Sequence, residues 1–367
     1  MMTDNEILCL LALQSVPNIG DISAKKLLRH FGSAKAIFDT SAKEITQLEG
    51  FGTLKAKALH LENYLAAAEK EYDFIEKNNI QLHYFEDKTY PYFLKQCIDA
   101  PILLFSKGNI SIENQPIISI VGTRNATKSG IENCENLIES LVPYNPIIVS
   151  GFAYGIDICA HKAAVKHNLQ TIACLAHGFD TIYPKVHRKY EKDILAQGGF
   201  FTDFWSDCNF DRKNFLKRNR VIAGLSEATI VIESAEKGGS LVTANIANSY
   251  NREVFAFPGR IDDKYSKGCN HLIKTNQARL LENVEDLVYI LNWDAKEQPA
   301  KQPELFVELT QEEEHIYSIL KPLETASLDE LALACQIPTY QMLPVLLNLE
   351  LKGLVNPMQG KMFRVVK

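Results

Sequence analysis

The stretch NPIIVSGFAYGIDICAHKAAVKH, residues 145–167, contains the three parts that predict the fold of this chain. It begins with an apolar, β-branched run, continues through a glycine-rich turn, and ends in a segment with helical spacing. The same alternation recurs between about residues 116 and 292. Continuous apolar strands that alternate with helices are typical of a parallel sheet covered on both faces. We therefore expect an α/β domain with a doubly wound, Rossmann-like sheet.

Further strands and helices extend this pattern on both sides of the quoted stretch. The other apolar runs are PIISIV (116–121), TIACLA (171–176), ATIVIES (228–234) and EVFAFP (253–258). The helical patterns between them are SGIENCENLIESL (129–141), RKYEKDILAQ (188–197), NFLKRNRVIAGL (214–225) and LVTANIANSY (241–250). Ligands of open α/β sheets bind at the carboxyl ends of the strands, so the loops that follow these runs are the candidate site.

The first part of the chain, residues 1–85, has apolar residues at helical spacing. VPNIGDISAKKLL is echoed by LEGFGTLKAKAL, which aligns Gly20 with Gly52 at a distance of 32 residues. This repeat is similar to a tandem helix-hairpin-helix (SAM-like) element, whose turn N–H groups can hold a DNA phosphate. A small bundle that uses glycine only to turn tightly is the alternative. An irregular, proline-bearing connector opens the second domain, residues 86–292.

Residues 293–307 are polar and contain proline, which indicates a linker. Residues 308–367 show three helical patterns followed by the short β-like run KMFRVVK, and we interpret them as a winged-helix domain. Its net charge is −2, and the third helix carries only Lys352, near its end. Recognition helices that enter a DNA groove are normally basic. We therefore favour a protein-contact role for this domain over duplex recognition.

Composition and charge limit the possible functions. The chain has 367 residues, a net charge of −6, 46% hydrophobic residues and 23% charged residues, as is usual for a globular protein. No apolar run is long enough for a membrane span, and we find no signal peptide, so we expect a cytoplasmic protein without a membrane partner. The eight cysteines form no CxxC pair, which favours reduced core thiols over a metal site.

The loops after the strands combine glycine with cations or hydroxyl groups. Gly122-Thr123-Arg124 follows the run at 116–121, and Ser150-Gly151 follows the run at 145–150. Lys185 lies beyond the third run, and Gly239, Ser240 and Thr243 lie beyond the fourth. Backbone N–H groups at such turns and helix starts bind phosphate. No dinucleotide fingerprint, Walker A motif, metal cluster or nucleophile motif accompanies them, so we predict no catalytic residue, no metal and no cofactor.

The stretch 211–224 is strongly basic although the chain is acidic. Five basic residues stand there against one acid, for a local charge of +4: Arg212, Lys213, Lys217, Arg218 and Arg220 against Asp211. Phe215 lies among them. Cations neutralise phosphates while an aromatic ring stacks on an unpaired base, which is the combination that single-stranded nucleic acid requires. A solvated basic helix with Phe215 in the core is the alternative.

The helical segment of the stretch 145–167 contains Asp157 and His161, four residues apart. This spacing permits a side-chain contact on one helix face. A structural pair is the favoured interpretation, and a catalytic dyad is the alternative.

Several blocks carry a family resemblance: SIVGTRNATKSG, SGFAYGIDICAHKAA, TIACLAHGFDTIYP, FLKRNRVIAGLSEATIVIESAEKGGSLVTANIA and REVFAFPGRIDDKYSKGCNHLI. Over about residues 115–285 the chain resembles the DNA-processing protein A (DprA/Smf) family. The resemblance implies a binder of single-stranded DNA that is not an enzyme. It also implies that the protein protects incoming DNA in natural transformation, loads the RecA recombinase onto it, and forms a homodimer through its Rossmann-like domain.

The loops, the basic stretch and the resemblance together give a candidate DNA-binding set. Its members are Gly122, Arg124, Ser150, Gly151, Lys185, Phe215, Lys217, Arg218, Asn219, Arg220, Gly239, Ser240 and Thr243. We expect them along one rim of the sheet, with Arg124 and Arg220 on the same side. Leu216 stands where the family commonly has proline, and His177 stands where a small or hydroxyl residue is usual.

Two other functions fit parts of the sequence. The first is a nucleotide-processing enzyme related to the nucleoside monophosphate phosphoribohydrolases, but those have a PGGxGTxxE block, and KGGSLVTAN lacks its glutamate. The second is a transcription regulator that uses the winged helix on duplex DNA, and the acidic balance of that domain counts against it.

Overall fold

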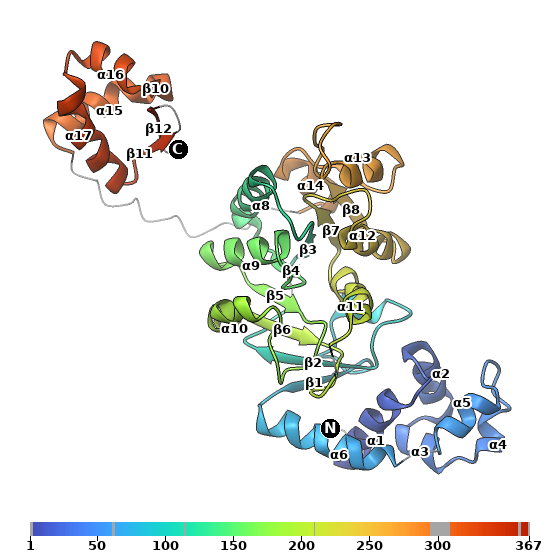
Figure 1. Cartoon of the computed structure of the whole chain (residues 1–367). Coiled ribbons are helices and arrows are strands. Elements are labelled where there is room, and N and C mark those ends of the chain that lie inside the picture. Colours follow the sequence, from blue (N-terminus) through green and yellow to red (C-terminus); the bar gives the residue numbers. More distant parts are fainter. Residues whose placement is uncertain are drawn as a thin grey trace. The chain divides into compact units, whose positions relative to one another are not determined.

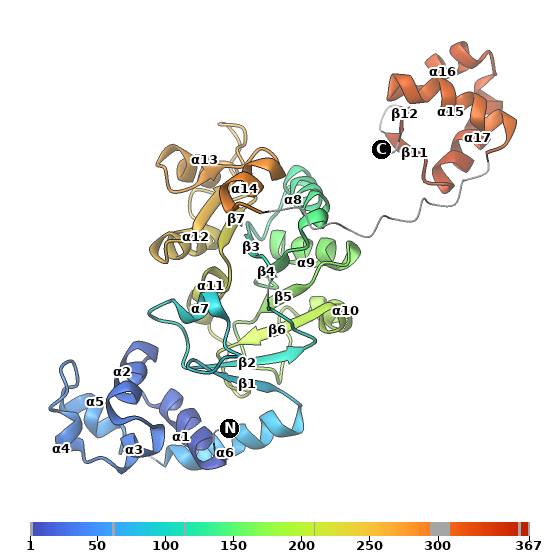
Figure 2. The ribbon, with the colours of Figure 1, turned by 180° about the vertical axis from the view of Figure 1, so that it is seen from behind.

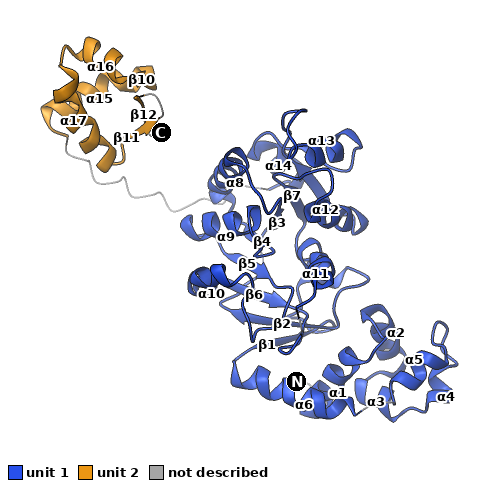
Figure 3. Ribbon diagram, viewed as in Figure 1, with its two compact units in different colours: residues 1–296 blue, residues 297–367 orange. Residues whose placement is uncertain are grey.

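The computed structural model describes residues 3–60, 63–113, 115–208, 210–293, 309–358 and 361–365. The chain divides into two compact units, residues 1–296 and residues 297–367 (Figure 3). In the described ranges, no helix combines the length and apolar composition that crossing a membrane requires. The predicted linker, 293–307, lies outside the described residues except for Trp293.

Among the described residues of the first unit, nine strands form one sheet in the order β1-β2-β6-β5-β4-β3-β7-β8-β9. The strands are β1 (Gln81–Tyr84), β2 (Leu103–Gly108), β3 (Ile117–Val121), β4 (Ile147–Ser150), β5 (Thr171–Cys174), β6 (Gly198–Thr202), β7 (Ala228–Val231), β8 (Glu253–Ala256) and β9 (Arg279–Leu280). Every pair from β6 to β9 is parallel, and β1 and β2 add an antiparallel edge. The strand order reverses at β3, which pairs with β4 on one side and β7 on the other.

Helices cover both faces of this sheet (Figures 1 and 2). They are α8 (Lys128–Ser140), α9 (Ile156–Lys166), α10 (Glu191–Gln197), α11 (Arg212–Leu225), α12 (Gly239–Ser249), α13 (Lys267–Lys274) and α14 (Val284–Leu291), with short 3₁₀ turns at Val142–Tyr144 and Lys185–Tyr190. Ile118 and Ile120 of β3 pack in one core with residues of α8 and α9. Val121 packs in another core with residues of α11 and α12. This alternation confirms the doubly wound α/β fold.

The N-terminal segment is helical, as predicted, and its repeat has a clear local geometry. The helices are α1 (Asp4–Ser15), α2 (Asp21–Phe31), α3 (Ala34–Asp39), α4 (Ala42–Ile45), α5 (Thr53–Ala58) and α6 (Tyr64–Lys77). Gly20 and Gly52 are the N-cap residues of α2 and α5 and have nearly the same backbone angles, φ −83° and ψ 173° against φ −79° and ψ 172°. The two copies therefore form equivalent turns.

Residues 81–115 differ from the irregular connector that we expected. β1, β2 and the short helix α7 (Tyr92–Lys95) lie there, and β2 is buried within the sheet. The prolines of this segment suggested irregular structure, but they flank the apolar run of β2 and do not interrupt it. β6 was also missed, because it begins with Gly198 and Gly199. A Cβ atom there would overlap the backbone carbonyls of Thr171 and Lys107, so glycine permits both strand pairings.

The second unit is a winged helix. It consists of α15 (Gln311–Leu323), β10 (Thr325–Ser327), α16 (Leu328–Cys335), α17 (Thr339–Leu351), β11 (Val355–Met358) and β12 (Met362–Val365). Thr310 and Ser327 cap α15 and α16 through capping boxes with Glu313 and Glu330. We predicted one terminal strand, whereas β10, β12 and β11 form a small sheet in that order.

Candidate nucleic-acid interface

A pocket of about 620 Å³ lies where the strand order reverses, at the carboxyl ends of β3 and β7. We call it the switch-point pocket, and its walls come from residues 121–125, 234–240 and 264–265 and from one face of α11. This position is where open α/β sheets bind ligands. The predicted residues that line it are Gly122, Arg124, Phe215, Arg218, Asn219, Gly239, Ser240 and Thr243.

The loop after β3 is held tightly against the loop after β7. The Thr123 N–H donates to the Glu233 carbonyl at 2.8 Å, and the buried Glu233 carboxylate accepts from the N–H and hydroxyl of Thr127 at 2.9 and 2.6 Å. A Cβ atom at Gly122 would lie 2.5 Å from the Ile156 side chain, so glycine is needed for this close approach. The fixed loop places the exposed Arg124 side chain at the pocket.

Phe215 contacts two guanidinium groups. Its ring centroid lies 5.1 Å from Arg124 Cζ and 5.9 Å from Arg218 Cζ. These distances are typical of cation–π contacts. Phe215 is half-buried, and its ring orients Arg124 in this structure. Its predicted stacking on a base stays a prediction.

Arg218 lies beneath the pocket and is almost fully buried, with 3% of its surface exposed. It donates to the carbonyls of Gly151, at 2.5 Å, and Cys174. Burial lowers the pKa of Arg218 and raises the pKa of the neighbouring Asp157, while the opposite charge of each acts against the other's shift. Arg218 therefore supplies positive charge from below, and its contacts to Gly151 and Cys174 hold it inside the domain.

The other wall of the pocket is the start of α12. Gly238 is the N-cap, and no side chain caps the helix. Asn219 donates to the Gly239 carbonyl at 3.4 Å, and Ser240 donates to the Ser234 hydroxyl at 2.9 Å. An eleven-residue helix without a side-chain cap leaves N–H groups that attract an anion.

Sequence reasoning left three cations out of the site that also line the pocket: Arg212, Lys237 and Lys264. Among the described residues, neither these three cations nor Arg124 forms an ion pair with a carboxylate. Arg212 and Lys237 were visible in the sequence as part of the basic stretch and of the glycine loop. Lys264 follows β8 and lies within the block REVFAFPGRIDDKYSKGCNHLI, in which no role was assigned to it.

Arg220 is not beside Arg124, which corrects our expectation. It lies on another face of α11, with Lys217, at a second pocket of about 660 Å³ that is also lined by Gly20 and Asp21. We call this the hairpin pocket. Arg220 pairs with Asp203 at 2.5 Å and with Asp21 at 3.1 Å. Burial disfavours its charge, but the carboxylates outweigh burial and raise the pKa of Arg220.

The remaining predicted residues lie away from the pocket lining. Ser150 is fully buried and donates to the Ile120 carbonyl at 2.6 Å, so it links β4 to β3. Lys185 is exposed at the start of a 3₁₀ turn. Gly151 is buried behind the pocket, where a Cβ atom would meet the Arg218 guanidinium at 2.6 Å.

The expected pairing of Asp157 with His161 is wrong. His161 hydrogen-bonds to the Thr171 hydroxyl at 2.7 Å, whereas Asp157 lies beside Arg218. Thr171 donates its proton to the Ile148 carbonyl, so His161 Nδ1 donates to Thr171. Burial lowers the pKa of His161 to about 3, which keeps its ring neutral.

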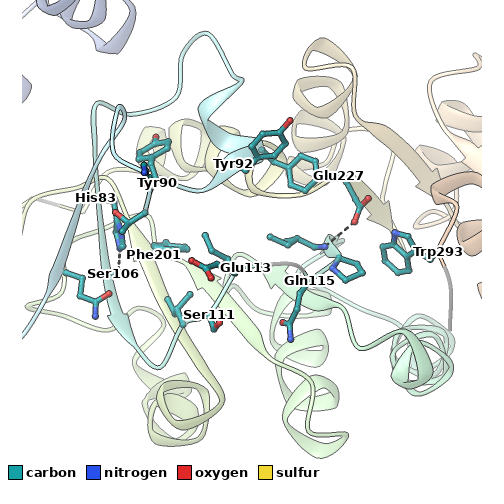
Figure 4. Close-up of a pocket in the computed structure, with 18 residues that line it drawn as sticks. His83, Tyr90, Tyr92, Ser106, Ser111, Glu113, Gln115, Phe201, Glu227 and Trp293 are labelled. Carbon is teal, nitrogen blue, oxygen red and sulfur yellow. Dashed lines mark hydrogen bonds between the residues drawn. The ribbon is translucent and has the colours of Figure 1, made fainter. Parts of the chain in front are cut away.

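A larger cavity, of about 750 Å³, lies at the opposite ends of the strands (Figure 4). Its lining includes Tyr92, Trp293 and the carboxylates of Glu113 and Glu227, with Lys88 as a cation. The Glu227 carboxylate accepts from the Ile117 N–H at 3.2 Å. Two carboxylates against one cation make this cavity a poor phosphate site.

The fold and the switch-point pocket define a class of protein in which a Rossmann-like domain follows a helical segment in the chain and precedes a winged helix. Three family models match the chain accordingly: DNA recombination-mediator protein A over residues 81–292, the DprA winged helix domain over 296–361, and a SAM-like helix-hairpin-helix tandem over 10–62. The first match covers more than half of the chain. This chain belongs to the DprA/Smf family.

Individual relatives agree with this assignment. Protein Smf of Escherichia coli is 33% identical over 310 residues, which are 83% of this chain and 81% of that protein. The X-ray structure of DNA processing protein A from Streptococcus pneumoniae superposes with a TM-score of 0.67 at 29% identity, over 80% of this chain and 99% of that chain. A Helicobacter pylori structure, whose title describes the single-stranded DNA binding mode of its DNA processing protein A, has a TM-score of 0.52 and 28% identity over 58% of this chain and 98% of that chain.

Proposed function

We propose that this chain binds single-stranded DNA through the switch-point pocket, protects incoming DNA in natural transformation, and loads the RecA recombinase onto it in the cytoplasm. It acts without catalysis and without a cofactor. One observation carries the proposal: the uncapped start of α12 lies beside Arg124, Arg212, Lys237 and Lys264, which form no ion pair with a described carboxylate. The family and the printed title of the Helicobacter pylori structure support it. The RecA step rests on the family resemblance.

The pocket favours phosphate binding without recognition of base sequence. Backbone N–H groups and guanidinium groups both bind phosphate oxygens, and neither distinguishes one base from another. The acidic net charge of the chain does not prevent this, because charges farther away than about 8 Å are screened at physiological salt. Asp157, which lines the pocket, is buried beside Arg218, and the buried Glu233 already accepts from Thr127.

Binding of single-stranded and double-stranded oligonucleotides of equal length, measured by fluorescence anisotropy at two salt concentrations, tests the proposal. We expect tighter binding of the single strand, with an affinity that falls as salt rises. Arg124→Ala should weaken binding about tenfold or more for every base composition and should reduce the salt slope by about one.

Unchanged binding by Arg124→Ala would place the DNA elsewhere on the molecule. Release of adenine from AMP would favour the phosphoribohydrolase-like alternative instead. No observation on the pocket favours that activity, because α12 has Thr243, Ala244 and Asn245 where that group of enzymes needs its glutamate.

We also propose that the chain forms a homodimer through its Rossmann-like domain. β9 is the last strand of the described sheet and has two residues, and its Leu280 is exposed. Light scattering after size exclusion should give twice the monomer mass, and Leu280→Lys should shift the protein toward the monomer. A monomer mass for the parent at every concentration would contradict the proposal.

A further inference from the structure

Three aromatic rings form a cluster beside the switch-point pocket. Tyr183 and Phe210 have ring centroids 4.7 Å apart, and both lie within 6 Å of Phe215, at 5.8 and 5.6 Å. We call these residues the ring cluster. They come from the loop after β5, from the residue before the α11 cap, and from the first turn of α11. Phe215 also lines the switch-point pocket, so the cluster is continuous with it.

The outer two rings are open to solvent. Phe210 exposes 54% of its surface and Tyr183 exposes 37%, whereas Phe215 is half-buried against the Arg124 guanidinium. Large aromatic side chains are normally buried, and exposed rings that adjoin an anion site mark a contact surface. The outer rings therefore have more free surface for a ligand than Phe215.

A buried histidine holds the loop that carries Tyr183. The Tyr183 N–H donates to His177 Nε2 at 3.2 Å, which leaves Nδ1 to donate to the Gly178 carbonyl at 2.8 Å. Thr202 fixes the same residue by donating to the His177 carbonyl at 2.8 Å. Only the neutral ring with its proton on Nδ1 makes both contacts. His177, which departs from the usual small or hydroxyl residue, thus positions Tyr183.

We propose that Tyr183 and Phe210 form a stacking surface for the unpaired bases of the strand whose phosphates occupy the switch-point pocket, with His177 as a positioning residue. This inference rests on the proposed function. Every base has a π face, so such a surface accepts all sequences. Paired bases in a duplex are stacked on one another and do not reach it. The surface therefore contributes to the preference for single strands, in addition to phosphate binding.

The test compares an oligothymidylate with a strand of the same length in which abasic residues replace the nucleosides. Phe210→Ala and Tyr183→Ala should each weaken binding of oligothymidylate by about 5- to 150-fold, the range for loss of one base stack. Neither should change binding of the abasic strand. Arg124→Ala, the matched control for phosphate contact, should weaken both strands by the same factor.

Two further variants separate a loss of base stacking from a loss of folded protein. Phe210→Trp should retain the affinity of the parent, and its fluorescence should be quenched by oligothymidylate but not by the abasic strand. His177→Ser should lower the affinity for oligothymidylate and leave the affinity for the abasic strand unchanged, which a merely destabilised protein would not do.

The outcomes distinguish failure of the stacking surface from failure of the proposed single-stranded DNA binding. If the parent binds neither strand, the proposed function fails. If the parent binds both strands equally, with a loss for Arg124→Ala alone, the stacking surface is wrong and the phosphate pocket stands. If the ring variants instead abolish capture of RecA while DNA binding persists, the cluster is a protein contact and our inference is overturned.

Discussion

Gly151 shows how one missing side chain shapes the site. A Cβ atom there would lie 2.6 Å from Arg218 Nη2 and 2.5 Å from Asp157 Oδ2. Gly151→Ala should therefore displace the buried guanidinium, with a loss of about 1–3 kcal/mol in the free energy of unfolding. Affinity for single-stranded DNA should fall as well, because the positive charge below the pocket moves. Thermal melting and fluorescence anisotropy measure the two effects.

Gly239 provides the matched control for that substitution. A Cβ atom at Gly239 meets nothing within 4 Å, although this residue also lines the pocket. Gly239→Ala should leave the melting temperature unchanged or raised, because alanine favours the helix. Equal losses of stability for both variants would contradict the steric explanation.

His161 makes stability depend on pH. Its pKa is about 3 in the folded protein because of burial, against an ordinary value of 6.5. Between these values the unfolded chain binds a proton that the folded protein does not, so stability falls as pH falls through 6.5. The contribution approaches about 1.4 kcal/mol for each pH unit below 6. Burial lowers the pKa of His83, His177 and His187 in the same direction.

Melting curves between pH 7.5 and pH 5 can isolate this contribution. His161→Gln should have a flatter pH dependence than the parent, whereas the exposed His271→Gln should follow the parent. A parallel decline in all three proteins would show that His161 does not titrate on unfolding.

At the scale of the element, α11 divides its cations between two faces. Residues 215, 218, 219 and 222 line the switch-point pocket, and residues 217 and 220 line the hairpin pocket. Successive residues of a helix are 100° apart, so the cations of one continuous basic stretch point to different faces. The basic stretch was visible in the sequence, but its separation into a side at the switch-point pocket and a side turned toward α2 was not.

Arg220→Ala should therefore lower the stability of the protein, whereas Arg124→Ala should lower its affinity for DNA. Arg220→Ala leaves Asp203 and Asp21, whose side chains are only 7% and 21% exposed, without their cation, which costs about 3 kcal/mol of unfolding free energy. Arg124 is exposed, so its removal should change stability by less than about 0.5 kcal/mol while weakening DNA binding. Urea unfolding measures the stability of each variant, and fluorescence anisotropy measures its affinity for single-stranded DNA. If Arg220→Ala is as stable as the parent but binds DNA weakly, Arg220 contacts DNA after all.

The third helix of the winged-helix unit carries an apolar surface. On α17, Tyr340, Leu343, Leu347 and Leu351 are all exposed, and the three leucines are spaced four residues apart. No basic residue lies within the helix bounds. We expect this face to contact protein, so Leu343→Glu with Leu347→Glu should abolish RecA capture in a pull-down and leave duplex binding unchanged. A lost duplex footprint with intact capture would support the regulator alternative.

Prediction of elements succeeded where a single physical signal dominated. The runs that became β3, β4, β5, β7 and β8 are continuous and apolar, as buried parallel strands must be. β6 failed because glycine has no strand propensity of its own, and only the neighbouring strands show why it is needed. The apolar run 102–105 that leads into β2 gave a fair signal that the flanking prolines outweighed.

At the scale of the whole first unit, the helical segment is bound to the sheet domain through polar contacts. Trp205 donates to Gln14 at 2.9 Å, Ser206 donates to Glu71 at 2.6 Å, and the Ile102 N–H donates to Asp21 at 2.8 Å. The partners are 81 to 191 residues apart in the chain. No local pattern pairs residues so distant, and sequence analysis consequently separated two segments that form one compact unit.

The ion pair between Asp21 and Arg220 bears on how truncated forms should be interpreted. A fragment that begins at residue 81 would lack Asp21 and would leave the Arg220 guanidinium with Asp203 as its remaining carboxylate partner. We expect such a fragment to bind single-stranded DNA more tightly than the full chain, because Arg220 would then be less fully neutralised. Measurements on the isolated sheet domain would then overstate the DNA affinity of the full chain. In the full chain, the turn at Gly20 and Asp21 lies against the side of α11 that carries Arg220.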